Sequence, residues 1–380
     1  MEMKEIGLKV WPIVGVIVVE AFLFGVHWFV YRTWVDFHGN LAPANTPLLR
    51  EVVIALAFSF VVAALLSFRF VNPLVSLFYK FACLWLGFLN FFVWASCLVW
   101  LIWFAIQLAG ISADPAPLRP WIVGPLFALA ILAAVYGLIN ALWIRIRRVT
   151  VKLPGLPQQW RGRKAVLLSD LHLGNVNGLG FCRRIAAMVA REKPDIVFVP
   201  GDLFDGTKAD CDRIAAPLKE LAPPFGMFYS TGNHEEFTGA AHFLEAVKRI
   251  GLRDLGGECV DMDGLQIAGV TYDEANYPLR MKAAIEGMNR DRSRPSILLN
   301  HAPSRLPMVA QAGFSLQLSG HTHGGQVFPF TWLTRRVFGK FTQGLHTFGS
   351  LQVYTSTGAG TWGPPMRVGS HPEIVVLTFD

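Results

Sequence analysis

Five short apolar runs in the last two-thirds of this 380-residue chain each end in a polar cluster rich in Asp, His and Asn. Such runs, bounded by Gly, Pro and Asn, are typical of buried strands. Polar residues just past a buried strand lie at its carboxyl end, the usual ligand site of an α/β sheet. We therefore expect an α/β domain in which five strands bring ligands to one edge. The runs are AVLLSD (165–170), IVFVPGD (196–202), MFYSTGNH (227–234), ILLNH (297–301) and LQLSGH (316–321).

The clusters at the ends of these runs supply the atoms that bind divalent metals. Two metals that share a carboxylate need three or four ligands each, and Asp, His and Asn provide them. One such cluster alone is explained as a polar strand cap or a satisfied core histidine, but five in order favour a dinuclear metal site. Several imidazoles in a mixed N/O set favour Mn, Fe or Zn over Mg or Ca. The clusters are Asp170-Leu-His172, Gly201-Asp202-Leu-Phe-Asp205, Gly232-Asn233-His234-Glu235, Asn300-His301 and Gly320-His321-Thr-His323.

The order DxH, GDxxD, GNHE, H, GHTH resembles that of the calcineurin-like metallophosphoesterases, over residues 166–380. The continuation Gly324-Gly325-Gln326 and the tail from Thr355 are similar to a bacterial branch of membrane-anchored predicted phosphohydrolases. Some relatives of that branch hydrolyse the pyrophosphate of UDP-diacylglucosamine in lipid A synthesis. The resemblance agrees with the fold that the alternating strand and helix patterns indicate, an α/β two-layer β-sandwich flanked by helices.

The resemblance also implies a division of the ligands. The bridging carboxylate would be Asp202, and a hydroxide shared between the two metals would attack phosphorus in line. One metal would be held by Asp170, His172 and His323, and the other by Asn233, His301 and His321.

Three further residues of the clusters are candidates for roles around the metals. His234 fits a general acid, or a cation that stabilises the transition state, and the alternative is a residue that only orients a ligand. Asp205 and Glu235 fit partners that support the histidines, or they are ordinary loop carboxylates.

Residues 1–150 have a different composition. Apolar runs over 10–31, 52–68, 81–108 and 121–144 are near or above the length that crosses a bilayer. They predict an all-α transmembrane domain of about four spans over 1–150. A basic linker over 151–164 and a metallophosphoesterase domain over 165–380 would follow. The alternative, a soluble helical bundle, lacks charged residues for a water-facing surface.

Charge predicts the topology and the partners. Arg145, Arg147, Arg148 and Lys152 follow the fourth run, so the positive-inside rule places both termini and the catalytic domain in the cytoplasm, at the inner membrane. Five cysteines without disulfide spacing agree with a reducing compartment. Of the net charge of +7, residues 1–144 carry +1. The remaining +6 is scattered, which suits a phosphate-bearing lipid partner and does not favour nucleic acid.

Two features outside the clusters carry weaker predictions. Glu20 and His27 lie seven residues apart, and so on one face of a helix. They form a pair, or contacts with a neighbouring helix, that fix the packing, or they are a site for a lipid or a proton. Residues 326–350 mix aromatic and basic side chains directly after the last histidines. They form a lip that binds an acyl chain or head group, or their aromatics pack under the sheet. The candidate substrate contacts are Trp332, Arg335, Arg336 and Arg367.

These patterns leave two classes of function. The first is a membrane-anchored enzyme that cleaves a phosphoester or pyrophosphate, in a lipid or lipid-linked molecule such as UDP-diacylglucosamine. The second is a membrane sensor or transport-linked protein with a regulatory metallo-domain, which the complete ligand set disfavours. Nuclease and protein phosphatase are lower alternatives. The chain lacks a basic stripe, and Leu-Phe-Asp-Gly follows Asp202 where the protein phosphatases of this superfamily carry DRG.

Overall fold

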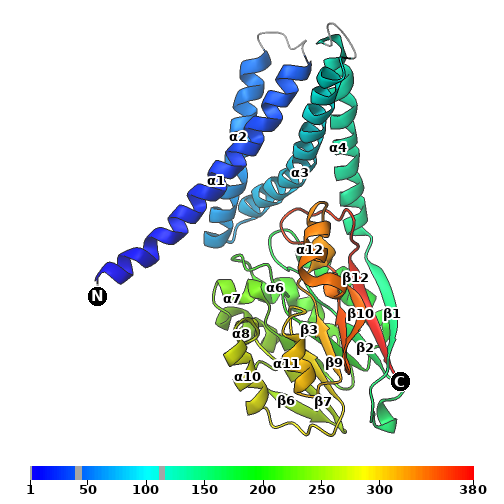
Figure 1. The fold of residues 1–380 in the computed structure, drawn as a ribbon. Coiled ribbons are helices and arrows are strands. Elements are labelled where there is room, and N and C mark those ends of the chain that lie inside the picture. The colour runs from blue at the N-terminus through cyan, green and yellow to red at the C-terminus, as the bar shows by residue number, and fades with distance from the viewer. Residues whose placement is uncertain (1, 39–44, 111–115) are drawn as a thin grey trace. The chain divides into compact units, whose positions relative to one another are not determined.

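The computed structural model describes residues 2–38, 45–110 and 116–380 (Figure 1). The chain forms two compact units, Met1–Tyr136 and Gly137–Asp380. The first unit is helical, and the second contains both sheets.

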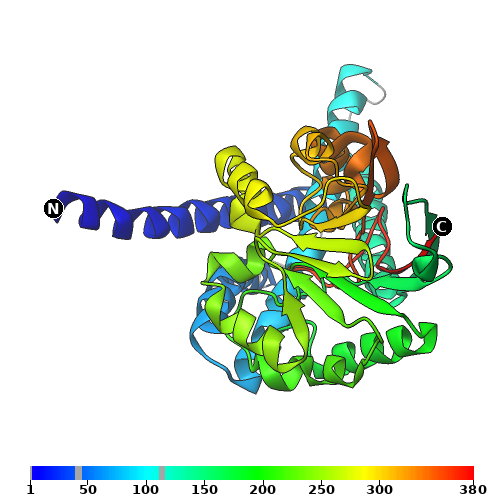
Figure 2. The same ribbon diagram turned by 90° about the horizontal axis from the view of Figure 1, so that it is seen from below.

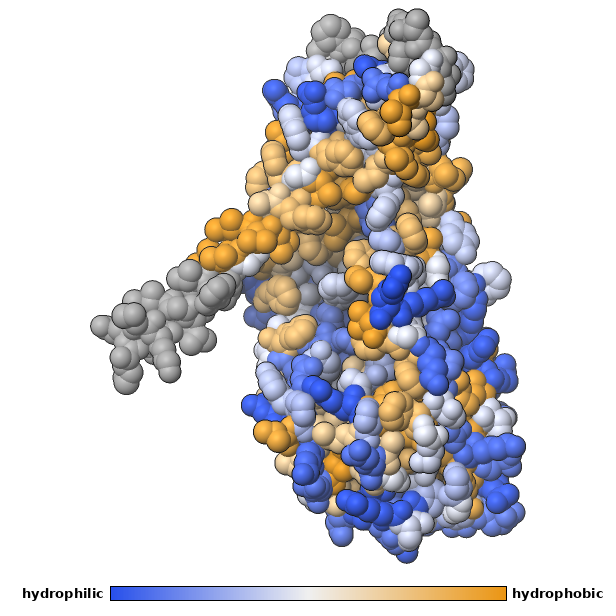
Figure 3. Space-filling model, in the orientation of Figure 1, coloured by the Kyte–Doolittle hydropathy of each residue, from blue (hydrophilic) through white to orange (hydrophobic). Residues whose placement is uncertain are grey.

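Four long helices lie wholly or mostly in the first unit, and each contains a stretch that is long and apolar enough to cross a membrane. Many large apolar side chains of these helices are exposed, and they predominate along the middle of the helices on the face shown in Figure 3, as expected of helices whose solvent is lipid. The four predicted spans are confirmed as four long apolar helices. At several ends the helices continue into the polar residues that flank the apolar runs. They are α1 (Glu2–His38), α2 (Asn45–Arg69), α3 (Pro73–Leu108) and α4 (Arg119–Leu142), with a short 3₁₀ turn, Ala116–Leu118, before α4.

The polar residues expected on one face of α1 behave differently from each other. His27 is buried, its Nδ1 lies 2.7 Å from the Leu23 carbonyl oxygen, and its Nε2 accepts from Trp85 Nε1 of α3 at 2.8 Å. Glu20 does not pair with it, and its buried carboxylate oxygens have no hydrogen-bond partner among the described residues. His27 therefore contacts a neighbouring helix, which was one of the two predicted arrangements.

The second unit is built on two six-stranded sheets. The first has the order β1-β12-β2-β3-β4-β5, and the second β10-β11-β9-β8-β7-β6. The strands of the first sheet are β1 (Arg145–Val151), β2 (Lys164–Leu167), β3 (Ile196–Pro200), β4 (Met227–Ser230), β5 (Leu252–Asp254) and β12 (Glu373–Phe379). Those of the second are β6 (Cys259–Met262), β7 (Leu265–Gly269), β8 (Ser296–Leu299), β9 (Leu316–Ser319), β10 (Gly344–Phe348) and β11 (Leu351–Thr355).

The sheets pack face to face, and helices cover their outer faces. Side chains such as Phe198 of the first sheet and Ile297 of the second share one core. Figure 2 shows the helices of residues 179–250, in green, on one side of the strands and those of 272–311, in yellow, on the other. The predicted two-layer sandwich flanked by helices is confirmed. The α-helices are α5 (Leu179–Glu192), α6 (Cys211–Ala215), α7 (Asn233–Phe237), α8 (Ala241–Arg249), α9 (Tyr272–Asn276), α10 (Pro278–Gly287), α11 (Leu306–Gln311) and α12 (Phe330–Phe338).

Short 3₁₀ turns complete the unit. They lie at Gln158–Trp160, Ala216–Glu220, His323–Gly325 and Gly339–Thr342. The first of them falls within the segment expected to be a linker.

The segment between the fourth span and β2 differs from that expected linker. Residues 145–151 form the edge strand β1, which pairs in parallel with β12 along its whole length. Beyond it, Leu153, Leu156 and Trp160 are buried in the core between the sheets. Apolar side chains placed among the basic residues therefore hold this segment on the domain.

The five polar-ended runs all became strands, and their carboxyl ends meet. β2, β3 and β4 run parallel in one sheet, and β8 and β9 run parallel in the other. The loops after these five strands carry the clusters predicted to bind metal.

Candidate metal centre

Two groups of three side chains come together at the carboxyl ends of the strands, and each group draws from loops of both sheets. In the first, His172 Nε2 lies 3.0 Å from His323 Nε2, and His323 Nε2 lies 3.4 Å from Asp170 Oδ1. In the second, Asn233 Oδ1 lies 3.1 Å from His301 Nε2 and 2.9 Å from His321 Nδ1. The structure thus brings together, in each group, three residues that the family resemblance assigned to one metal.

Asp202 lies between the two groups. Its Oδ2 is 3.2 Å from His301 Nε2 and 3.7 Å from His172 Nε2. Its other oxygen, Oδ1, accepts the backbone N–H of His234 at 3.0 Å. This one carboxylate therefore reaches both groups and is itself held by the loop after β4.

The spacing of these atoms fits bound cations. Three overlapping sets of His and Asp ligand atoms lie within 4.8 Å of one another: Asp170/His172/His323, His172/Asp202/His234 and Asp202/His301/His321. Two ligand atoms that each lie about 2.0–2.1 Å from one ion are separated by roughly 3 Å. The contacts within each group have that length. Nitrogen lone pairs that point at one another in a buried site are suited to a metal placed between them.

The backbone is strained where it presents these ligands. Asp170, His172, Asp202, His321 and His323 all have φ between 45° and 68°, in the left-handed region that non-glycine residues rarely adopt. Such strain persists only when the surrounding structure enforces it, and it concentrates at functional sites. The sequence does not reveal this strain, because glycine does not occupy those positions.

Two glycines beside the ligands have no room for a side chain. A Cβ on Gly201 (φ 88°) would lie 2.6 Å from His301 Nδ1. A Cβ on Gly320 would collide with Ser169 Oγ and Asp170 Oδ2. The glycines therefore let neighbouring strand ends approach closely enough for their ligands to meet.

Backbone carbonyls orient two of the histidines. His301 Nδ1 lies 2.8 Å from the Pro200 carbonyl oxygen, and His234 Nδ1 lies 2.9 Å from the Asp205 carbonyl oxygen. A proton on each Nδ1 satisfies these contacts and leaves Nε2 with a free lone pair. His301 then presents its lone pair to the site, and His234 presents its Nε2 beside His172, with ring centroids 4.6 Å apart.

Charges in the site shift several pKa values in the metal-free protein. Burial alone would lower the pKa of His301, but the nearby carboxylate of Asp202 raises it to about 10. Burial alone would raise the pKa of Asp202, and His301 and His172 hold it well below its usual range. Burial, and then the neighbouring positive groups, lower the pKa of His172 and of His323 far enough to keep both rings neutral. Neutral imidazole and ionised carboxylate are the forms that bind metals.

Glu235 and Asp205 brace loops rather than histidine rings. The buried carboxylate of Glu235 accepts three backbone N–H groups, from Gly232 at 2.8 Å, Phe204 at 2.9 Å and Asp202 at 3.1 Å. Asp205 accepts from the backbone of Asn175 and Thr207. Of the two predicted readings, these contacts correspond to loop carboxylates, and only the Asp205 backbone reaches a histidine.

Arg367 is not placed to contact a phosphate, contrary to the sequence-based expectation. It is 0% exposed, and its guanidinium donates to the carbonyl oxygens of His323 at 2.6 Å and Thr357 at 2.8 Å. Its Nη2 also lies 3.2 Å from His323 Nδ1. The side chain lies behind the candidate ligand His323 and braces the loop that carries it.

The segment after the last histidines contains an exposed apolar helix, α12. Phe330, Trp332, Leu333 and Val337 are exposed, as are Arg335 and Arg336. Phe338 faces inward, with its ring centroid 6.2 Å from that of His321. The exposed aromatics argue against packing under the sheet, and α12 lies at the edge of the site.

Three further aromatic residues lie at the site and were not predicted. Tyr272 is within 6 Å of the rings of His301 and His321, and Phe237 and Trp362 flank His234 at 6.0 and 5.9 Å. Trp362 lies in the C-terminal tail whose pattern resembled one branch of the family, which was the available signal. Tyr272 and Phe237 have no distinguishing pattern in the sequence.

Comparison with known proteins agrees with the fold of the second unit. Residues 163–325 match the calcineurin-like phosphoesterase family. The chain is 34% identical over 257 residues to an uncharacterised metallophosphoesterase of Aquifex aeolicus, covering 66% of this chain and 97% of that one. It is also 34% identical over 240 residues to an uncharacterised metallophosphoesterase of Campylobacter jejuni, covering 62% of this chain and 63% of that protein's length. A transmembrane protein with a metallophosphoesterase domain from Danio rerio is 34% identical over 264 residues, covering 65% and 60% of the two chains.

The chain belongs to the calcineurin-like metallophosphoesterase family, as the order of its clusters indicated. It is a membrane protein, with four helices of spanning length and relatives described as transmembrane proteins. Membership implies divalent metal ions, and the donor set at the carboxyl ends of the strands suits such ions.

Proposed function

We propose that this protein is a membrane-anchored phosphoesterase with a dinuclear metal centre, which hydrolyses a phosphoester or pyrophosphate bond. The observation that carries the proposal is the meeting of two three-ligand groups around the single carboxylate Asp202. Asp170, His172 and His323 would hold one metal, and Asn233, His301 and His321 the other. Two divalent cations at such a site supply Lewis-acid charge that activates water and neutralises phosphoryl oxygens.

His234 is the candidate for proton transfer to the leaving group. Its Nδ1 is anchored on the Asp205 carbonyl oxygen, and its ring stands edge-on to His172. It is only partly buried, so a substrate can reach Nε2. A protonated ring at this place donates a proton to the departing oxygen.

The donor set supports Mn, Fe or Zn as the native metals. Four imidazoles and one amide join two carboxylates, and nitrogen-rich sets bind these ions in preference to Mg or Ca. Metal analysis of the purified protein, by inductively coupled plasma mass spectrometry, tests this choice. A site filled only by Mg or Ca would contradict it.

We propose further that the substrate is amphiphilic, a lipid or lipid-linked phosphate such as UDP-diacylglucosamine. Exposed apolar side chains surround the candidate catalytic residues, with Phe237 and Trp362 at His234 and α12 near His321. Apolar side chains left in water beside a polar site favour a ligand with an apolar part. Arg335 and Arg336 of α12 add cations suited to an anionic head group.

The proposed location is the inner membrane with the catalytic unit in the cytoplasm. Basic residues that follow the fourth span support it, through the positive-inside rule. This orientation is tested with a cysteine introduced on the surface of the catalytic unit and a membrane-impermeant reagent added to intact cells. Labelling from outside would contradict the proposed orientation.

Turnover by the detergent-purified full chain with added Mn tests the function. Bis-p-nitrophenyl phosphate, p-nitrophenyl phosphate and UDP-diacylglucosamine are compared in parallel, with Asp202→Ala as the control. Metal-dependent hydrolysis that is lost in Asp202→Ala supports the proposal, and the preferred substrate identifies the bond that is cut. No hydrolysis of any of the three by protein that contains two metals would favour the regulatory alternative.

A further inference from the structure

A cavity of about 440 Å³, partly open to the surface, lies among α1, α2, α3 and α4. It draws its lining from all four helices, including His27 and Tyr31 of α1, Val53 of α2, Trp85 of α3 and Gly124 of α4. A volume of this size is within the range of about 300–1,000 Å³ that is usual for small-molecule sites.

The chemistry of the wall favours hydrocarbon over water. Most lining residues are apolar, and the ring nitrogens of His27 are already bonded to the Leu23 carbonyl oxygen and Trp85 Nε1. A buried water needs two to four polar partners, and few remain here. An empty space would leave the lining atoms without dispersion contacts. Within the span, the available occupant of matching polarity is an acyl chain.

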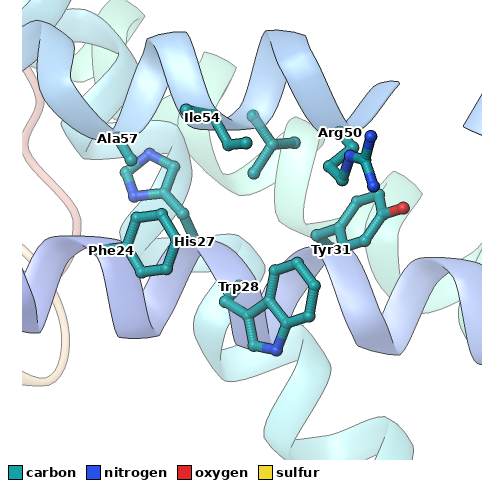
Figure 4. Close-up of a pocket in the computed structure, with 8 residues that line it drawn as sticks. Phe24, His27, Trp28, Tyr31, Arg50, Ile54 and Ala57 are labelled. Atoms are coloured by element: carbon teal, nitrogen blue, oxygen red, sulfur yellow. The ribbon is translucent and has the colours of Figure 1, made fainter. Parts of the chain in front are cut away.

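A polar edge lies next to this cavity (Figure 4). A smaller pocket shares His27, Tyr31 and Val53 with it and is also lined by Trp28 and Arg50. Figure 4 shows Tyr31 of α1 and Arg50 of α2 together at one end of that pocket. Arg50 is exposed and lies near the beginning of α2, at one edge of the span. A guanidinium beside a phenol hydroxyl and an indole suits the phosphate of a lipid at the membrane interface.

We propose that the helical unit binds one anionic phospholipid, with an acyl chain in the cavity and the phosphate at Arg50 and Tyr31. The site is formed by the first unit alone, and it does not depend on the proposed phosphoesterase activity. The cation at its edge favours an anionic over a zwitterionic head group.

Filling the cavity tests the acyl-chain part. The full chain is reconstituted in nanodiscs of phosphatidylglycerol and phosphatidylcholine, extracted in mild detergent, and its retained lipid is counted by native mass spectrometry. Gly124→Leu places a side chain where a Cβ meets no atom within 4 Å, so the helix can accept it. Gly25→Leu on α1 is the matched control, because a Cβ there also meets no atom within 4 Å, and Gly25 does not line the cavity.

The wild type and Gly25→Leu should each retain one lipid, and Gly124→Leu should retain about tenfold less. Ala128→Leu, at a second lining position, repeats the test if Gly124→Leu does not fold. Equal retention by the wild type and a folded cavity variant, or no lipid on the wild type, would overturn the proposal.

The head-group part is tested by Arg50→Gln, with Arg69→Gln at the other end of α2 as the control. The lipid retained by the wild type and by Arg69→Gln should be enriched about tenfold in phosphatidylglycerol over phosphatidylcholine. Arg50→Gln should lose this enrichment, because only that variant removes the charge-assisted contact with the phosphate. If Arg50→Gln keeps the enrichment in phosphatidylglycerol, the phosphate does not bind at Arg50.

Discussion

At the scale of single residues, the candidate ligand His301 predicts that metal binding is coupled to proton release. In the metal-free protein its pKa is raised to about 10, because Asp202 outweighs the effect of burial. The ring is therefore protonated at neutral pH and must lose that proton to bind a metal. Apparent metal affinity should rise with pH, by up to about tenfold per unit for each proton released, and level off above that pKa. Titration calorimetry in buffers of different ionisation enthalpy measures the number of protons released.

The control for this proton count is His301→Gln. Its remaining metal binding should release about one proton fewer than the wild type. Equal proton release by the two proteins would assign the proton to another group.

The role proposed for His234 predicts a dependence on the leaving group. Donation of a proton matters most when the departing oxygen is basic, so His234→Gln should slow hydrolysis of an alkyl ester by about 10²–10⁴-fold. Hydrolysis of a p-nitrophenyl ester should change much less, and the metal content should stay the same. His242→Gln, at an exposed histidine of α8, is the matched control. An equal loss on both esters would indicate that His234 only orients other groups.

Glu235 predicts an effect on stability. Its carboxylate accepts three backbone N–H groups that belong to the loops carrying Asp202 and Asn233. Glu235→Ala leaves these donors unpaired, and a buried unpaired donor costs about 1–3 kcal/mol. We expect thermal unfolding at a lower temperature and weaker metal binding, with Glu235→Gln intermediate. Glu258→Ala, at an exposed carboxylate, should unfold like the wild type. Normal stability of Glu235→Ala would contradict the bracing role.

At the scale of elements, α12 is the part of the site that sequence could not orient. The sequence shows its aromatics and arginines, but not which side of the helix is covered. In the structure Thr331 is buried, Phe338 is half-buried, and the other apolar side chains, Phe330, Trp332, Leu333 and Val337, are exposed. Trp332→Ser combined with Val337→Ser should lower turnover on a lipid-embedded substrate and leave turnover on p-nitrophenyl phosphate unchanged. Leu279→Ser on α10, which removes an exposed apolar side chain elsewhere, is the control. An equal loss of turnover on both substrates would contradict the hypothesis that α12 forms a lip for lipid.

The strands show why other parts of the site could be predicted. Short apolar runs that end in Asp or His predicted both the strand and the place where a candidate ligand follows it, as at β3 and Asp202. Arg367 could not be assigned in the same way, because its partners are carbonyl groups of distant loops. The strand β1 was missed because its basic residues concealed a short β-branched pattern that pairs with β12.

At the scale of the whole molecule, the two units separate the candidate chemistry from the lipid-facing helices. The candidate ligands all lie in residues 137–380, and the spans Ile13–His38, Thr46–Arg69 and Pro73–Leu108 lie wholly in the first unit. A ligand that binds only the folded state stabilises that state by roughly 4 kcal/mol when it is present at 1,000 times its dissociation constant. The unit that holds the ligands should therefore gain all the protection that the metals confer.

Hydrogen exchange in nanodiscs, with metal bound and after chelation, measures how far that protection extends. Chelation should speed exchange in the loops after β2, β3, β4, β8 and β9. These loops have strained backbone and carry the candidate ligands, so loss of the metals would leave them less stable. Exchange in α1, α2 and α3 should stay the same, and Asp202→Ala should show no response to the chelator. A change in those helices would mean that the metal state reaches the bundle. The sensor alternative requires that coupling, and an anchored enzyme does not.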